Sequence, residues 1–207
     1  MFFIINRQDA GKLLAKKLED YRGADTVVYV LPRGGVVVGY EIAKELGATL
    51  DIITTRKIGH PDNPEYAVCA ITEEGDLFCN EFEKALLDPE WLKKEAEKEK
   101  QEALRRKSLY LKDKPHILAE DKISIIVDDG IATGLTMFAA IKFLKKEKPK
   151  KIIVAVPVAP RDVVAKLRKE VDEVITLDDS EPFLGSVGAY YRDFPQVSDQ
   201  EVIALLQ

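Results

Sequence analysis

The chain has 207 residues, a net charge of −5 and a hydrophobic share of 46%. This length suits one domain with a sizeable core, and the negative charge argues against a general nucleic-acid binder. The apolar segment Met1–Ile5 ends at Asn6, which makes it too short for a signal peptide or a membrane span, and we expect a cytoplasmic protein. Cys69 and Cys79 form no CxxC pair, and we interpret them as small core residues in a reducing compartment, with a disulfide as the alternative.

Helical and extended patterns alternate along the chain. In chain order we predict a helix over 9–18, a strand over 26–31, a helix over 36–46, a strand over 50–55, a mobile loop with a hairpin within 56–80, a helix over 88–112, a strand over 123–127, a helix over 137–146, a strand over 151–156, a helix over 161–169, a strand over 173–177 and a short helix over 199–206. Strands separated by helices are typical of an α/β protein with a doubly wound, mainly parallel sheet.

The longest predicted helix has a strong start signal. Asp88 is a capping residue, Pro89 suits the first helical position, and Glu90 follows in the first turn. The helix would reach about Lys112, a length of roughly 35 Å at 1.5 Å per residue. Its charges mix both signs, and we interpret them as a solvated face with i,i+4 ion pairs rather than a nucleic-acid-binding patch.

The most informative segment begins at the apolar run 123–127. Asp128 and Asp129 follow where this strand ends, and the small-residue turn 130–136 leads into the next helix. Unpaired N–H groups and the positive dipole end of that helix make such a turn a cradle for phosphate. The two acids suit vicinal hydroxyls or Mg²⁺ instead, so the segment as a whole predicts a ribose 5-phosphate site. The alternative is an ordinary strand-turn-helix unit whose acids only cap the helix.

Two other strand ends carry compatible chemistry. The turn 32–35 supplies the cation Arg33 and glycines that expose backbone N–H groups and permit unusual dihedral angles, which suits a pyrophosphate. Arg56 and Lys57 open a loop rich in Gly and Pro that could close as a lid and neutralise a leaving group. Taken singly, each is also explained as a glycine-rich turn or a charged surface loop. The glycines fit neither the G-x-G-x-x-G nor the Walker A pattern.

In this order, the motifs at 31–35, 56–57 and 125–136 resemble those of the type I phosphoribosyltransferases. From 9 to 199 the chain is similar to a group of bacterial and archaeal members whose base substrate is generally unassigned. The resemblance implies a single phosphoribosyltransferase-like domain over 1–207, with a flexible lid and hairpin at about 56–80, the long inserted helix at about 88–112 and a C-terminal hood at about 178–207.

The resemblance also implies an activity: transfer of ribose 5-phosphate between phosphoribosyl diphosphate (PRPP) and a nitrogenous base, a purine among the candidates, as in nucleotide salvage, with Mg²⁺ and in a homodimer. Arg33, Arg56, Lys57, Asp128 and Asp129 would be catalytic, and the two acids would also be the metal ligands. The PRPP-binding residues would be Pro32, Arg33, Gly34 and Gly35 on the pyrophosphate loop, which often carries a non-proline cis peptide, then Asp128 and Asp129, and Gly130, Ile131, Ala132, Thr133, Gly134, Leu135 and Thr136 around the 5′-phosphate.

Some residues depart from the family pattern. Ala132 stands where enzymes for 6-oxopurines place a catalytic aspartate, so this loop looks like that of adenine phosphoribosyltransferase. The tail segments 187–188 and 193–194 look more like a 6-oxopurine hood, so the base stays open. A PRPP or nucleotide sensor that regulates a partner is the alternative function.

Few residues are candidates for proton transfer or base stacking. Glu65 is a weak candidate for general acid or base, although we favour a surface role for it. The aromatic residues of the hood are candidates for stacking on a base, although we favour a small-core role; they are Phe183, Tyr190, Tyr191 and Phe194.

Overall fold

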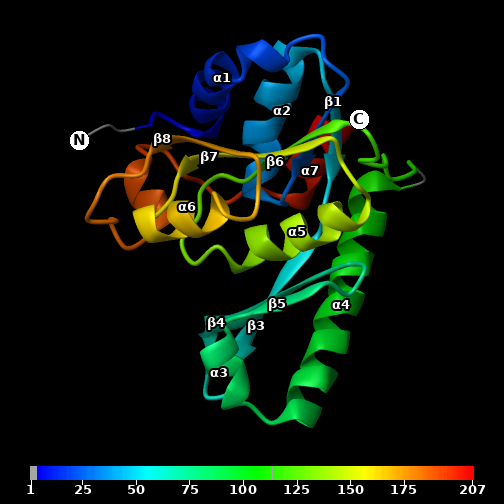
Figure 1. Ribbon diagram of the computed structural model, residues 1–207, viewed down its shortest axis with the longest axis vertical. Coiled ribbons are helices and arrows are strands. Elements are labelled where there is room, and N and C mark those ends of the chain that lie inside the picture. The colour runs from blue at the N-terminus through cyan, green and yellow to red at the C-terminus, as the bar shows by residue number, and fades with distance from the viewer. Residues whose placement is uncertain (1–3, 113) are drawn as a thin grey trace.

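The structure is a computed structural model that describes residues 4–112 and 114–207. The first residues of the apolar segment Met1–Ile5 therefore lie outside the described part. Figure 1 shows a larger part built around a parallel sheet and a smaller antiparallel part, with the long helix α4 running beside both. Within the described residues, no helix has the length and apolar character that a membrane crossing requires.

The central sheet has five strands in the order β2-β1-β6-β7-β8, and every neighbouring pair is parallel. Its strands are β1 (Thr26–Val30), β2 (Thr49–Ile52), β6 (Ile123–Val127), β7 (Lys151–Val158) and β8 (Glu173–Asp178). All five residues of β1 are buried, as expected for a strand covered on both faces. The predicted doubly wound α/β fold is confirmed.

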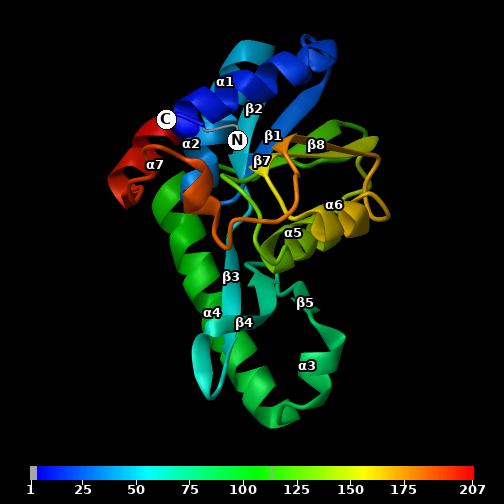
Figure 2. The same cartoon turned by 90° about the vertical axis from the view of Figure 1, so that its left-hand side faces the viewer.

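Helices cover both faces of this sheet (Figure 2). Val28 and Val30 pack with helices α1 (Arg7–Lys17), α2 (Gly34–Leu46) and α7 (Asp199–Leu206) on one face. The alternate residues Val27 and Tyr29 pack with α5 (Leu135–Lys146) and α6 (Arg161–Leu167) on the other. Short 3₁₀ helices lie at η1 (Glu19–Tyr21) and η2 (Val187–Tyr190). The period-2 alternation of side chains in the strands thus separates two apolar cores.

Local capping sets the ends of the helices. The α1 helix begins at Arg7, two residues before the predicted start, because the Asn6 side chain accepts a hydrogen bond from the N–H of Asp9 at 2.9 Å. The α2 helix ends at Leu46 as predicted, and the next residue, Gly47, adopts the left-handed conformation with φ 66°.

The segment after β2 forms a second, antiparallel sheet. It consists of β3 (Thr55–His60), β4 (Asn63–Thr72) and β5 (Leu77–Cys79), followed by the short helix α3 (Glu81–Ala85). The predicted hairpin is confirmed, but Arg56 and Lys57 lie within β3 and do not open a loop. Strand pairing with β4 satisfies the backbone that we expected to be irregular, while the mobility of this segment stays a prediction.

Cys69 and Cys79 form a disulfide, which corrects our interpretation of them as free core residues. The two cysteines are direct partners in the register of β4 and β5. Side chains directly opposite each other in an antiparallel pair lie close enough to be bridged. The sequence spacing alone does not reveal this pairing, because it depends on where the chain turns between the two strands.

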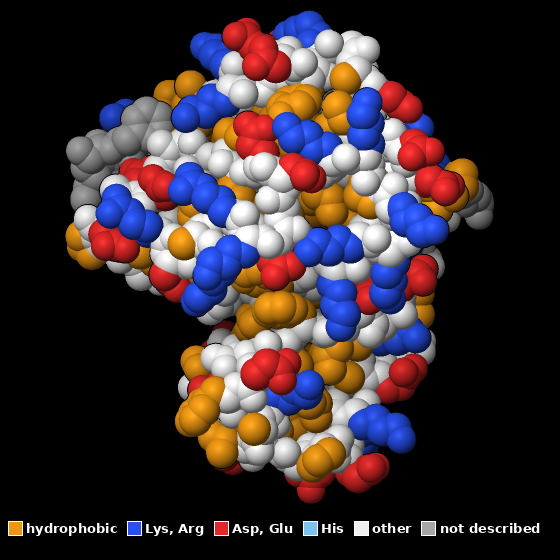
Figure 3. Space-filling model, viewed as in Figure 1, with side chains coloured by type: hydrophobic (Ala, Val, Ile, Leu, Met, Phe, Trp, Pro, Cys, Tyr) orange, Lys and Arg blue, Asp and Glu red, His pale blue; other side chains and the backbone are white. Residues whose placement is uncertain are grey.

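Helix α4 (Pro89–Leu111) confirms the predicted start and nearly the predicted end. The Asp88 side chain accepts the N–H of Trp91 at 2.9 Å, and Pro89 is the first helical residue. Ion pairs along the exposed face include Glu95–Lys98 at 2.6 Å. Figure 3 shows acidic and basic side chains intermingled on this side of the molecule. The mixture supports a solvated face over a patch of one sign.

His116 connects three separate parts of the fold. Its Nδ1 lies 2.8 Å from an oxygen of Asp51 in β2, and its Nε2 lies 2.9 Å from an oxygen of Glu147 at the end of α5. Both acids also accept backbone N–H groups of the segment after His116, those of Ile117 and Ala119. Burial lowers the pKa of His116, but the adjacent carboxylates of Asp51 and Glu147 outweigh burial and raise it overall.

This raised pKa predicts a pH-dependent stability. A histidine whose pKa is raised by folding contributes its full stability below its unfolded pKa of about 6.5 and loses it as the pH rises through the folded value. We expect His116→Gln to lower the free energy of unfolding by about 1–3 kcal/mol at pH 6 and by less at pH 9. Denaturant unfolding at both pH values measures this, with His60→Gln as the control; an equal loss at both pH values would contradict the charged state of His116.

Candidate functional site

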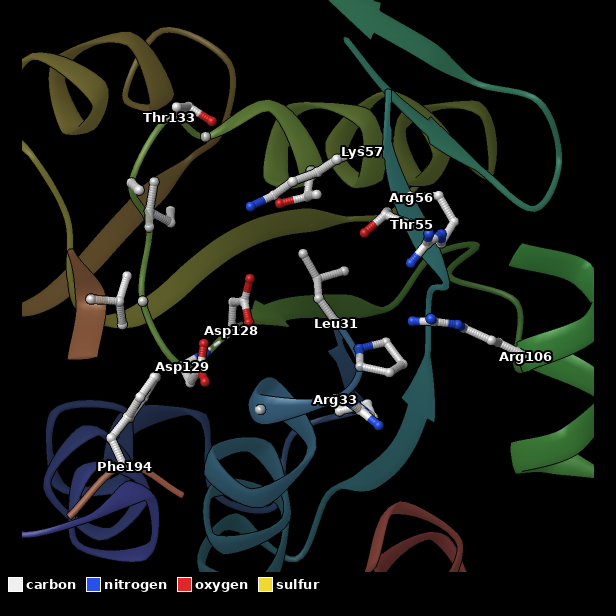
Figure 4. A pocket seen from close by; sticks show the side chains of 18 residues that line it. Leu31, Arg33, Thr55, Arg56, Lys57, Arg106, Asp128, Asp129, Thr133 and Phe194 are labelled. Carbon is white, nitrogen blue, oxygen red and sulfur yellow. Dashed lines mark hydrogen bonds between the residues drawn. The ribbon is translucent and has the colours of Figure 1, made fainter. Parts of the chain in front are cut away.

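A cavity of about 430 Å³ lies where β1 and β6 end and β3 begins (Figure 4). The chain runs from β1 to β2 on one side of this point and from β6 to β7 on the other, and ligands bind at such reversals of strand order. The residues that line the cavity are Leu31, Pro32, Arg33, Gly34, Thr55, Arg56, Lys57, Arg106, Asp128, Asp129, Gly130, Ile131, Ala132, Thr133, Gly134, Thr136, Val187 and Phe194.

The turn after β1 packs tightly against the acid pair. The peptide bond between Pro32 and Arg33 is cis. A Cβ atom on Gly34 would lie 1.8 Å from Oδ2 of Asp129, and one on Gly35 would lie 2.9 Å from Cα of Asp128. Neither glycine adopts the left-handed backbone, so the expected unusual dihedral angles are not the reason for them. Glycine is needed here because the turn approaches the acids too closely for any side chain.

Asp129 is held by a partner that sequence reasoning missed. The Nε of Arg7 donates to Oδ2 of Asp129 at 2.7 Å, and its Nη1 donates to the carbonyl oxygen of Pro195 at 2.7 Å. The guanidinium of Arg7 also lies 3.7 Å from the ring centre of Phe194. The hydroxyl of Tyr191 donates to the carbonyl oxygen of Asp129 at 2.6 Å. The C-terminal segment and α1 therefore fix this acid from behind.

Asp128 is left in a more negative environment. Burial and the nearby charge of Asp129 raise its pKa well above the usual range of an aspartate, while Lys57 acts weakly in the other direction. Its Oδ1 accepts the N–H of Asp129 at 2.8 Å. Asp128 has no ion pair within the described residues, so the acid pair carries more negative charge than its protein partners balance.

The turn after β6 forms the opposite end of the cavity. Gly130 has φ 152° and Gly134 has φ 81°, conformations that side chains rarely adopt, and α5 begins directly afterwards at Leu135. The first N–H groups of a helix have no intrahelical acceptors. Because Thr133 and Thr136 also face the cavity, this end offers the donors and positive dipole that phosphate requires.

A cationic wall lies across from the acid pair. It consists of Arg33, Arg56, Lys57 and Arg106, all of which line the cavity. In Figure 4, Lys57 points across the cavity, while Arg56 and Arg106 approach each other from β3 and α4. Sequence reasoning missed Arg106, because a mixed-charge helix gives no sign of which cation turns inward.

Most of the predicted site residues meet in this cavity, with two exceptions. Gly35 does not line the cavity, because it packs against the backbone of Asp128. Leu135 is buried with Ala70 and Ala139, because the first turn of α5 faces the antiparallel sheet. The remaining thirteen line the cavity, and their roles toward a ligand stay predictions.

The candidates for proton transfer and base stacking lie in different surroundings. Glu65 is exposed on β4 and does not line the cavity, as we favoured. Tyr190 and Tyr191 are buried in the core, and Phe183 packs against it. Phe194 also packs against that core, yet its ring reaches the cavity beside Val187.

Comparisons with known proteins agree on one family. The model of the phosphoribosyl transferase domain matches residues 5–192. Two Mycobacterium tuberculosis proteins, from strains CDC 1551 and H37Rv, are each named "Putative phosphoribosyl transferase" and are 40% identical over 203 residues. The match covers 97% of this chain and 46% of each relative, so the chain spans about half the length of the curated relatives it matches.

Solved structures share the fold. The protein TT1426 from Thermus thermophilus superposes with a TM-score of 0.82 at 39% identity, covering 100% of this chain and 98% of that one. A hypothetical protein from Neisseria gonorrhoeae with bound ppGpp gives a TM-score of 0.52 at 15% identity over 99% and 94% of the two chains, a likeness of fold alone. The family match and the relatives together show that this chain belongs to the phosphoribosyl transferase domain family.

Proposed function

We propose that the chain binds PRPP and transfers its ribose 5-phosphate group to or from a nitrogenous base. One observation carries the proposal: a phosphate cradle, an acid pair and a cationic wall surround a single cavity of about 430 Å³. A ribose 5-phosphate with a diphosphate on C1 has the matching sequence of groups, namely a monoester, a diol and a second, more highly charged anion. The family of the chain supports the same ligand.

The residues divide among the parts of this ligand. The 5′-phosphate would accept hydrogen bonds from the turn 130–136 at the start of α5, where Thr133 and Thr136 add hydroxyl donors. Asp128 and Asp129 would accept from the ribose hydroxyls. The diphosphate would lie toward Arg33 and the cations of β3, since that side of the cavity carries the positive charge.

The acid pair also fits Mg²⁺. Burial and then the charge of Asp129 raise the pKa of Asp128, and a bound cation would balance the negative charge of the pair. Among the described residues no group of three or more His, Cys, Asp or Glu side chains gathers to hold a metal. Mg²⁺ is commonly held by one or two carboxylates together with substrate phosphates, so two acids are sufficient here. When bound, the ion would neutralise charge on the diphosphate.

The proposed reaction needs no nucleophilic side chain. The bond between C1 and the diphosphate oxygen breaks and its electron pair leaves with the diphosphate. A lone pair of the base nitrogen forms the new bond to C1, and the proton that this nitrogen carries passes to water. Arg33, Arg56 and Lys57 would stabilise the charge that builds on the leaving group. The base would lie against the apolar side of the cavity, where Ile131 and Val187 line the wall.

A specific observation favours one second candidate, a sensor that binds PRPP or a nucleotide without turnover. Among the described residues that line the cavity, Asp128 and Asp129 are the only acids, and Ala132 offers no carboxylate to exchange a proton with the base. Incubation with PRPP and a panel of bases, with the release of diphosphate as the measurement, separates the two functions. Binding of PRPP without release of diphosphate for any base would favour the sensor.

The ribose assignment predicts the effect of one amide substitution. Asp129→Asn removes a charged acceptor and loosens the pair with Arg7, so we expect the affinity for Mg²⁺-PRPP to fall about tenfold or more. Titration calorimetry measures the change. Asp178→Asn is the matched control, because Asp178 ends the parallel strand β8 but does not line the cavity. Equal affinities for Asp129→Asn and wild type would remove the acid pair from the site.

The raised pKa of Asp128 predicts a second, ligand-free effect. Because folding raises this pKa, the folded state loses stability as the pH rises from the unfolded value toward the folded one. Asp128→Asn removes that loss while keeping an oxygen for the N–H of Asp129. We expect the melting temperature of the variant, relative to wild type, to be higher at pH 8 than at pH 4. A difference in melting temperature between variant and wild type that is the same at both pH values would contradict the raised pKa of Asp128.

A further inference from the structure

Helix α4 brings one cation into the cavity that belongs to none of the sequence motifs. Arg106 lines the wall beside Arg56 and Lys57, although it lies about fifty residues further along the chain. Figure 4 shows the Arg56 and Arg106 side chains approaching each other from β3 and α4. Two guanidinium groups that face the same space repel each other unless an anion lies between them.

Acids on α4 orient both of these arginines from behind. The Nε of Arg56 donates to Glu99 at 2.7 Å, and the Nε of Arg106 donates to Glu102 at 2.9 Å. Each of these hydrogen bonds uses only Nε, so the terminal nitrogens of both groups remain for a ligand. Both side chains keep more than a quarter of their surface exposed, at 29% for Arg56 and 28% for Arg106, although each has an acid partner.

The helix itself is fixed at the level of the cavity. The buried hydroxyl of Thr54 donates to the carbonyl oxygen of Ala103 at 3.0 Å and lies 3.1 Å from an oxygen of Glu73. The other oxygen of Glu73 accepts from Lys107 at 2.9 Å. Arg106 therefore projects from a helical turn that is bound on one side of it to Thr54, just before β3, and on the other side to Glu73, just after β4.

The same helix reaches the third arginine of the wall. The hydroxyl of Tyr110 donates to Asp199 at 2.6 Å, and that oxygen lies 3.5 Å from Nη1 of Arg33. Burial, followed by the hydrogen bond and charge of Asp199, raises the pKa of Tyr110 to about 12, so its hydroxyl stays a donor at neutral pH. Helix α4 thus sets Arg106 directly, Arg56 through Glu99 and Arg33 through the Tyr110–Asp199 contact.

We propose that Arg106 is a diphosphate-binding residue, which closes the cationic wall from a helix outside the sheet motifs and is oriented by Glu102. The inference rests on the proposed function, since it assumes that the anion at this wall is the diphosphate of PRPP. The phosphate cradle lies at the far end of the cavity, around Thr133 (Figure 4). Arg106 therefore acts on the diphosphate and not on the 5′-phosphate.

The neighbouring Arg105 provides a matched control. It has the same charge, lies on the same helix and donates to the same Glu102 at 2.7 Å, yet its side chain is 60% exposed and does not line the cavity. Arg105→Gln and Arg106→Gln therefore make the same chemical change and disturb the same acid. Only their position relative to the cavity differs.

The test measures three ligands by titration calorimetry: Mg²⁺-pyrophosphate, Mg²⁺-PRPP and ribose 5-phosphate. We expect Arg106→Gln to lower the affinities for pyrophosphate and PRPP about tenfold or more. The affinity for ribose 5-phosphate should stay within about twofold of the wild-type value. Arg105→Gln should leave all three within about twofold. Arg106→Lys should recover part of the loss, because an ammonium keeps the charge but not the planar fork of donors.

The outcomes separate the inference from the function on which it rests. Wild-type protein that binds neither PRPP nor pyrophosphate overturns both. PRPP binding by wild type with equal affinities for Arg105→Gln and Arg106→Gln overturns only the role of Arg106. An equal loss for ribose 5-phosphate and pyrophosphate in both Arg106 variants also overturns it, because a general disturbance of the cavity would then explain the effect.

Discussion

The cavity depends on the contact between the turn after β1 and the acids after β6. Gly34 and Gly35 press against Asp129 and Asp128 so closely that no Cβ fits between them. This contact is possible because β1 and β6 are neighbours in register, so their carboxyl ends deliver both segments to the same place. Arg7 then holds the acid that the turn approaches.

Charge in the cavity is separated in space, and the fold maintains that separation from two directions. The acids stand on the parallel sheet with a buried arginine behind one of them. The cations stand mainly on β3 and α4, where Glu99 and Glu102 restrain them without filling the cavity. Burial, together with the charge of Asp129, raises the pKa of the Asp128 carboxyl group within this arrangement.

The sequence predicted the parts of the molecule that local patterns determine. Apolar runs and capping residues located the parallel strands and α4, and the turns at 32–35 and 130–136 were found because small residues follow buried strands. Arg7 was missed because it contacts Asp129, which lies 122 residues away in the sequence. Arg106 was missed because only the structure shows that its side of α4 faces the cavity. The Cys69–Cys79 disulfide was disfavoured for a related reason: strand register decides it, and composition does not record register.

The path of α4 has a consequence for how the protein can be divided. The parallel sheet alone carries Asp128, Asp129, the phosphate cradle and Arg33, while Arg56 and Lys57 stand on the antiparallel sheet and Arg106 stands on the helix beside it. A fragment cut between the two sheets would keep the acid pair and the turn 130–136 and would lose most of the cationic wall. The smaller part and α4 therefore supply three of the four cations of the cationic wall.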